Sequence, residues 1–139
     1  MDHTLPVRQA VVEHLLEGAH TVLRALVGTK VYGMFVPNSA GLPRVCYTGP
    51  DTVPYEDSCA VGSEVSFVLN VFSQSPTEDE CAAIASELIN ILDEDSLPLA
   101  DGIGLLGIDW IRTQILPDET CDGFRAVVDF VVTTRETVS

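Results

Sequence analysis

The sequence predicts an α+β domain that has a mostly antiparallel sheet, two packed helices and a C-terminal β-hairpin. Residues 62–74 alternate between the two faces of a strand, and one of these faces is apolar from Val65 to Val71. Apolar residues recur at helical spacing near the N-terminus and again after Thr77. Two runs rich in β-branched residues end the chain and are joined by a polar turn, which is typical of a hairpin. Helices and hairpins in this mixed order favour the α+β class.

Length and composition are those of a single domain spanning residues 1–139. The chain has 139 residues, of which 46% are hydrophobic and 20% charged. It contains no internal repeat, low-complexity tract or linker. No two of its four cysteines are spaced as in a zinc ribbon or a thioredoxin-type pair, so we expect four reduced thiols. Cys46 and Cys81 are expected to be small core residues.

The first element is predicted to be one helix, Pro6–Val27. Proline suits the first turn of a helix, and Gly28 suits the position just after its end. Polar residues gather on one side of this helix, and we expect that side to be solvated; they are Glu13, His14, Glu17, His20 and Arg24. Glu17 and His20 have the Glu-x-x-His spacing of di-iron proteins, but no histidine follows His20 to complete a second pair. No metal site is therefore predicted.

Three strands are predicted next, and the third has two different faces. Short strands at Val31–Val36 and Arg44–Thr48 precede a polar loop, Gly49–Ala60. In Gly62–Gln74, the apolar face is expected to pack on the helices; it carries Val65, Phe67, Leu69 and Val71. The other face is half polar, and its Val68 and Phe72 are expected to be partly buried against a neighbouring subunit. The alternative is that both pack under the first helix.

A second helix and a hairpin complete the predicted fold. Thr77 and Glu80 have the spacing of a capping box, which predicts a helix from there to about Asp93. The strands Ile108–Leu116 and Phe124–Thr134 then form the C-terminal hairpin.

Charge and motif content argue against several function classes. The chain has 21 acidic and 7 basic residues, so its formal net charge of −14 repels nucleic-acid phosphates and anionic membranes. No apolar run reaches the roughly 18 residues of a membrane span, and Met1–Arg8 does not resemble a signal peptide. All histidines lie within the first 20 residues, and the glycines of the G-x-G-x-x-G run from Gly102 precede a strand rather than a helix. We expect no enzyme activity, catalytic residue or cofactor.

The order of the segments resembles a known protein family. The segments concerned are L-R-A-L-V-G from Leu23, K-V-Y-G-M-F-V-P from Lys30, L-P-R-V-C-Y-T-G from Leu42, G-S-E-V-S-F-V-L-N-V-F-S-Q from Gly62 and F-R-A-V-V-D-F-V-V-T-T from Phe124. In this order they resemble the tail terminator, or tail completion, proteins of long-tailed phages and of phage-like particles such as gene transfer agents. One departure is that Cys46 and Tyr47 stand where that family often has small or aliphatic residues.

The resemblance implies a structural role in a virion. A homohexameric ring would cap the head-proximal end of the tail tube, stop its polymerisation and join it to the head. The implied partners are the tail tube protein and a head connector or stopper protein, and DNA would pass through the lumen without specific binding. Assembly would take place in the bacterial cytoplasm. The alternatives are a neck stopper or connector-joining protein and, in another class, a small-molecule-binding or enzymatic α+β domain.

Two sets of residues are candidates for contacts in such a ring. The acidic residues Asp51, Glu56 and Asp57 of the predicted loop are expected to reach the tube or line the lumen. Candidate subunit-interface residues are Val68, Phe72, Arg112 and Arg125. Acidic residues crowd the middle of the sequence whereas Arg112, Arg125 and Arg135 lie near its end, and opposite charges at opposite ends would suit a head-to-tail ring.

Overall fold

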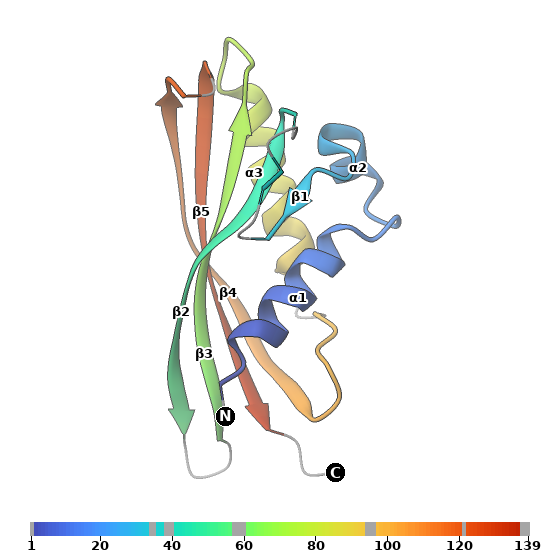
Figure 1. Ribbon diagram of the computed structural model, residues 1–139, viewed down its shortest axis with the longest axis vertical. Coiled ribbons are helices and arrows are strands. Elements are labelled where there is room, and N and C mark those ends of the chain that lie inside the picture. Colours follow the sequence, from blue (N-terminus) through green and yellow to red (C-terminus); the bar gives the residue numbers. More distant parts are fainter. Residues whose placement is uncertain are drawn as a thin grey trace.

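The computed structural model is a twisted five-stranded sheet with helices on one side (Figure 1). It describes residues 2–33, 36–37, 41–56, 61–93, 97–120 and 122–136. The strand order is β1-β2-β3-β5-β4, and every pair is antiparallel except β1 with β2. The elements are α1 (Thr4–Leu15), α2 (Thr21–Val27), β1 (Val31–Tyr32), β2 (Arg44–Glu56), β3 (Val61–Ser73), α3 (Asp79–Leu92), β4 (Ile103–Asp118) and β5 (Gly123–Glu136). The predicted α+β class and C-terminal hairpin are confirmed, and α2 is an additional short helix.

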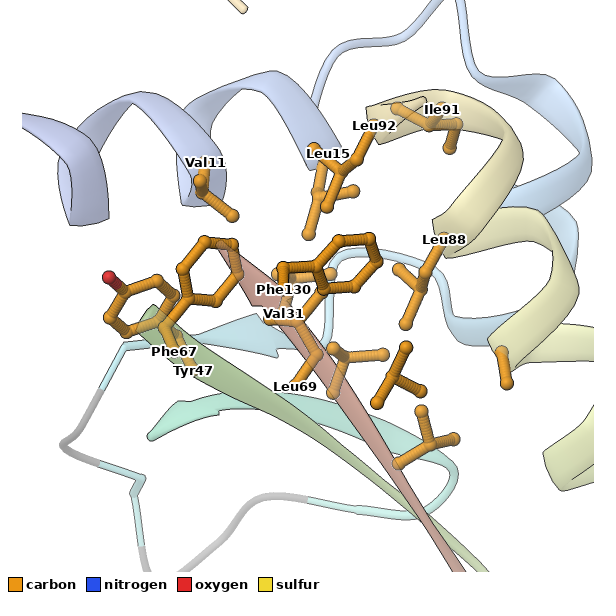
Figure 2. Close-up of a cluster of buried hydrophobic side chains, with 14 of the residues drawn as sticks. Val11, Leu15, Val31, Tyr47, Phe67, Leu69, Leu88, Ile91, Leu92 and Phe130 are labelled. Atoms are coloured by element: carbon orange, nitrogen blue, oxygen red, sulfur yellow. The ribbon is translucent and has the colours of Figure 1, made fainter. Parts of the chain in front are cut away.

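The core lies between the sheet and the helices, and β3 is at its centre (Figure 2). Every second residue of β3 from Val65 to Val71 is buried, as its alternation predicts. Phe67 stacks on Tyr47 of β2 and on Phe130 of β5, with ring centroids 4.7 and 5.6 Å apart. These three rings form a row across adjacent strands and contribute packing beyond their buried area.

Helices α1 and α3 together cover this row (Figure 2). The apolar stripe of α3 includes Cys81, Ile84, Leu88 and Leu92. The predicted capping box is not formed. Glu80 instead accepts a hydrogen bond from the hydroxyl of Ser73 at 2.6 Å, and the N-cap position is Glu78. A tertiary contact to the end of β3 therefore takes the place of the local cap.

The predicted single helix Pro6–Val27 is wrong, because the chain turns between α1 and α2. Gly18 lies in this turn, and glycine weakens a helix interior. The guanidinium of Arg24 donates to the carbonyl of Leu16 and so satisfies a carbonyl at the broken end. His14 is only 8% exposed, so the expected solvated helix face is also wrong at this residue.

The predicted loop Gly49–Ala60 is wrong for Gly49–Glu56, which belong to β2. The pairing of β2 with β3 shifts between Thr48 and Asp51, where Gly49 has a φ of 59°. Pro50 and Pro54 are compatible with this strand because β1 pairs only with Val45 and Cys46 and leaves the rest of β2 at a sheet edge among the described residues. Residues Asp51–Glu56 and Val61–Glu64 extend beyond the helices, and we call them the β2–β3 arm (Figure 1).

The N-terminus is attached to the sheet by a buried polar cluster. Nδ1 of His3 lies 2.7 Å from the hydroxyl oxygen of Thr134, and the backbone N–H of His3 donates to the hydroxyl of Ser63 at 3.2 Å. Thr134 in turn donates to the carbonyl of Ser63 at 3.2 Å. Burial lowers the pKa of His3 below its usual 6.5, because the charged imidazolium loses its hydration.

The lowered pKa of His3 predicts that acid destabilises the fold. The unfolded chain takes up a proton at His3 before the folded chain does, so the free energy of unfolding should fall as the pH drops below about 6.5. Urea denaturation at about pH 7.5 and about pH 5.5 measures this fall. His3→Asn keeps a donor near Thr134 but cannot titrate, and it should lose less stability than the unmodified chain over this interval. Equal losses in both proteins would contradict the assignment to His3.

Candidate functional site: the open face of the sheet

The sheet face away from the helices is covered by no other element of the described chain. Directly opposed residues in antiparallel strands share a face, so the register defines this surface. We call it the open face; it comprises Ser66, Val68, Asn70 and Phe72 of β3 and the residues opposite them on β2 and β5, continued onto β4. The helices lie on the other side of the sheet (Figure 1).

Val68 and Phe72 are half-buried side chains of the open face. Val68 lies between Thr48 of β2 and Asp129 of β5 in the register. Phe72 lies between two arginines, Arg44 and Arg125. The alternative that Val68 and Phe72 pack under the first helix is therefore wrong, because α1 covers the opposite face.

Polar groups of the open face are largely paired with one another. Asn70 donates from Nδ2 to the hydroxyl of Thr48 at 2.6 Å. The guanidinium of Arg112 is 3.1 Å from a carboxylate oxygen of Asp129. Arg112 is 65% exposed, so this ion pair contributes at most about 1 kcal/mol. Breaking this ion pair would therefore cost little free energy, and the Arg112 guanidinium can interact with another molecule instead.

Arginines on the open face lie toward one end of the sheet. Arg44 and Arg125 flank Phe72, and the carbon of the Arg44 guanidinium is 5.1 Å from the centre of the Phe72 ring, within cation–π distance. Nε of Arg125 is 3.9 Å from a carboxylate oxygen of Asp118 at the same end. Arg112 follows toward the middle of the sheet.

Acidic residues occupy the other end of the open face. Asp51 is opposite Ser66, Glu64 is opposite Thr133, and Asp109 is opposite Val131. The open face thus carries more arginines toward one end and more carboxylates toward the other. There are two exceptions: Asp118 lies beside Arg125 at the basic end, and Arg135 pairs with Gly104 near the acidic end.

Two of the three acidic candidates of the sequence lie on the β2–β3 arm rather than in a loop. Asp51 and Glu56 are exposed residues of β2. Asp57 lies outside the described residues. Val53 and Val61 of the same arm are 48% and 47% exposed, so the arm also presents apolar surface.

The outer edge of β4 is a surface that the sequence reasoning missed. β4 pairs only with β5 among the described residues, and two register shifts interrupt that pairing. Three large apolar residues at or beside these shifts are exposed, namely Leu106, Trp110 and Ile111. Adjacent apolar residues, Leu105 with Leu106 and Trp110 with Ile111, were the available signal, because a half-buried strand would alternate more strictly. Unpaired, exposed strand edges of this kind favour contact with another chain.

The thiols of Cys46 and Cys81 are buried, and a groove beside the arm is open. The thiol of Cys81 lies in the core, 3.3 Å from the carbonyl oxygen of Phe124. Cys46 is buried as expected but on the open-face side of the sheet, opposite Asn70, and its burial raises the pKa of its thiol. An open groove beside the arm is lined by Asp2, Thr52 and Glu56 among others. It brings mainly acceptors together and does not resemble an enclosed pocket with convergent polar groups.

No described helix is long and apolar enough to cross a lipid bilayer; the longest is α3, with 14 residues.

Comparisons with known proteins found similar solved structures and a matching family model. A chain from the virion of a native gene transfer agent particle superposes with a TM-score of 0.81 at 26% identity, with 94% of this chain and 95% of that chain covered. The gp17 protein of bacteriophage SPP1 has the same fold, with a TM-score of 0.60, 16% identity and coverage of 94% and 89%. No curated protein matches significantly. The model of the tail completion protein gp17 family matches residues 9–135, which confirms the family resemblance seen in the sequence. The chain therefore belongs to the tail completion protein gp17 family.

Proposed function

We propose that this protein forms a homohexameric ring that terminates a phage-type tail. The ring caps the head-proximal end of the tail tube, stops tube polymerisation and joins the tail to the head connector. The observation that carries the proposal is the open face, whose charged ends are opposite in sign and whose flanking strand edges are unpaired within the described chain. Its role is structural rather than catalytic, in keeping with the family.

The two ends of the open face favour a head-to-tail contact between copies. In a closed ring, each subunit uses two different surfaces, one for each neighbour. The basic end around Arg44 and Arg125 of one subunit complements the acidic arm of the next. Phe72 at the basic end and Val53 on the arm add apolar surface to this contact. Arg112 and Val68 extend it toward the middle of the sheet.

The acidic charge of the chain suits a ring through which DNA slides. Six copies carry 6 × −14 = −84 formal charges. Acidic side chains within a Debye length of roughly 8 Å repel the phosphate backbone. DNA then passes through the lumen without specific binding, because a ring that gripped phosphates would slow its passage.

A stopper or connector-joining protein at the neck is the second candidate. It has the same location in the particle but contacts the portal or its adaptor instead of the tail tube. The protruding β2–β3 arm favours neither partner by itself, since an acidic strand pair can dock on a basic surface of either one. The two roles differ in what happens to tail length when the protein is missing.

Deletion of the gene should give overlong tails that are not joined to heads. Without a terminator, tube subunits continue to add at the free end, so electron micrographs should show a broad distribution of tail lengths. The unmodified gene supplied in trans should restore one length and head attachment. Tails of normal length that remain detached from heads would instead support the stopper role.

Phe72→Asp combined with Val68→Asp should prevent ring formation. Each change places a carboxylate on surface that the ring buries, next to the partners Arg44 and Asp129 of the same subunit. Native mass spectrometry should show a hexamer, formed in solution or on isolated tubes, for the unmodified chain and only monomers for the variant. Ser86→Asp is the matched control, because Ser86 is exposed on α3 on the other side of the sheet. A hexameric double variant would exclude the open face from the interface.

Replacing Asp51, Glu56 and Asp57 with alanine should impair assembly without unfolding the subunit. The chain would lose three charges that we place against the tube or the lumen, two of them on the arm, and surface substitutions usually change stability by about 0.5 kcal/mol or less. The measurements are tail length, head joining and DNA delivery in the complemented deletion strain. A variant with alanine at Glu13, Asp93 and Asp101 removes the same charge from exposed positions outside the arm. Normal particles with the arm variant would show that the arm carries no contact.

A further inference from the structure

The corner between α1 and α2 gathers two imidazoles and a carboxylate that the proposed function does not use. We propose that His14, Glu17 and His20 bind a divalent transition-metal ion of the Zn²⁺ type. Each residue offers one ligand atom, and the three atoms lie within 4.8 Å of one another. Two nitrogen donors and one carboxylate oxygen form a donor set that zinc accepts in proteins, with a fourth position left for water.

The break in the helix creates this arrangement. In one continuous helix, His14 and His20 would be separated by about 9 Å along the axis, because each residue adds about 1.5 Å. In the structure their ring centroids are 4.9 Å apart, edge to face. Two backbone hydrogen bonds set the corner, from Glu17 to the carbonyl of His14 at 3.2 Å and from His20 to the carbonyl of Glu17 at 3.1 Å. The turn therefore places the Glu17 carboxylate near both rings.

The ligand nitrogens are buried and have no hydrogen-bond partner. Nδ1 of His14 lies 3.3 Å from one carboxylate oxygen of Glu17, and Nε2 of His20 lies 3.7 Å from the other, but neither nitrogen makes a hydrogen bond. The His14 side chain is 9% exposed. A buried polar atom without a partner is unfavourable, and a bound cation would satisfy both nitrogens at once. Glu17 is 47% exposed, so the site opens to solvent on its side.

The distances suit a small cation. A tetrahedral zinc ion with bonds of about 2.0–2.1 Å holds its ligand atoms about 3.3 Å apart. The two contacts to Glu17 already have nearly this spacing, and small side-chain rotations would bring all three ligand atoms to the metal. The strongly acidic chain also raises the local concentration of divalent cations. The ion would fix the end of α1 to the start of α2.

Titration of the metal-free full-length protein with Zn²⁺ tests the proposal. Calorimetry should show one ion per chain, and the ion should raise the melting temperature. Glu17→Gln and His20→Gln should each weaken Zn²⁺ binding by about tenfold or more, since each removes one of three protein ligands. Glu13→Gln is the matched control, because it removes the same charge from an exposed position of α1 and should leave binding unchanged.

Co²⁺ substitution separates this site from the cysteines. A tetrahedral Co²⁺ complex of nitrogen and oxygen ligands absorbs in the visible range and lacks a thiolate charge-transfer band. The proposal is overturned by a thiolate band, by absence of Zn²⁺ binding, or by binding that both Glu17→Gln and His20→Gln retain. Both variants leave the buried His14 in place, so we expect them to fold. Circular dichroism of each variant checks this separately from metal binding.

Discussion

The period-two alternation of β3 is the constraint on which the rest of the structure depends. β3 lies between β2 and β5 and pairs with both. The side of the sheet that a β3 residue faces therefore determines the side that its partners on β2 and β5 face. With Phe67 on the helix side, Tyr47 and Phe130 must also face the helices, and α1 and α3 cover the resulting row of rings. A slip of one residue would turn this row outward and leave the helices without a core. Two glycines tighten the frame, since a Cβ at Gly62 or Gly123 would lie within 2.0 Å of a backbone carbonyl oxygen.

The same alternation determines what is left uncovered. A two-layer domain can bury only one face of its sheet with its own helices, and here the other face keeps half-buried Val68 and Phe72 among paired polar groups. This face is neither a solvated surface nor a second core. Its mixed apolar and polar composition is of the kind found at contacts between proteins that are stable on their own. The chain belongs to the tail completion family, and the proposed ring would bury this surface between its subunits.

The N-terminal third of the chain connects the layers by polar contacts rather than by apolar packing alone. His3 holds the start of α1 to the ends of β3 and β5, and the edge-to-face contact of the His14 and His20 rings packs the end of α1 against the start of α2. Buried polar groups stabilise a fold only where their partners are fixed. Both clusters are built from residues that are distant in a straight helix or along the sequence, so each depends on the tertiary structure to bring its members together.

The sequence by itself determined the fold class, the central strand, the C-terminal hairpin, the burial of Cys81 and the family. These features follow from periodicity and segment order, both of which can be recognised in the sequence without coordinates. Only the tertiary structure decided the helix break at Gly18, the extension of β2 through Pro50 and Pro54, and the contact of Glu80 with Ser73 instead of a capping box. A proline is acceptable in β2 because that part of the strand lies at an edge, and edge position is a property of the assembled sheet. The same holds for Leu106 and Ile111 of β4, whose exposure results from register shifts against β5. The local sequence pattern assigns a residue to a strand or a helix. Its neighbours across the sheet decide which of its backbone hydrogen bonds are made and which of its faces is buried.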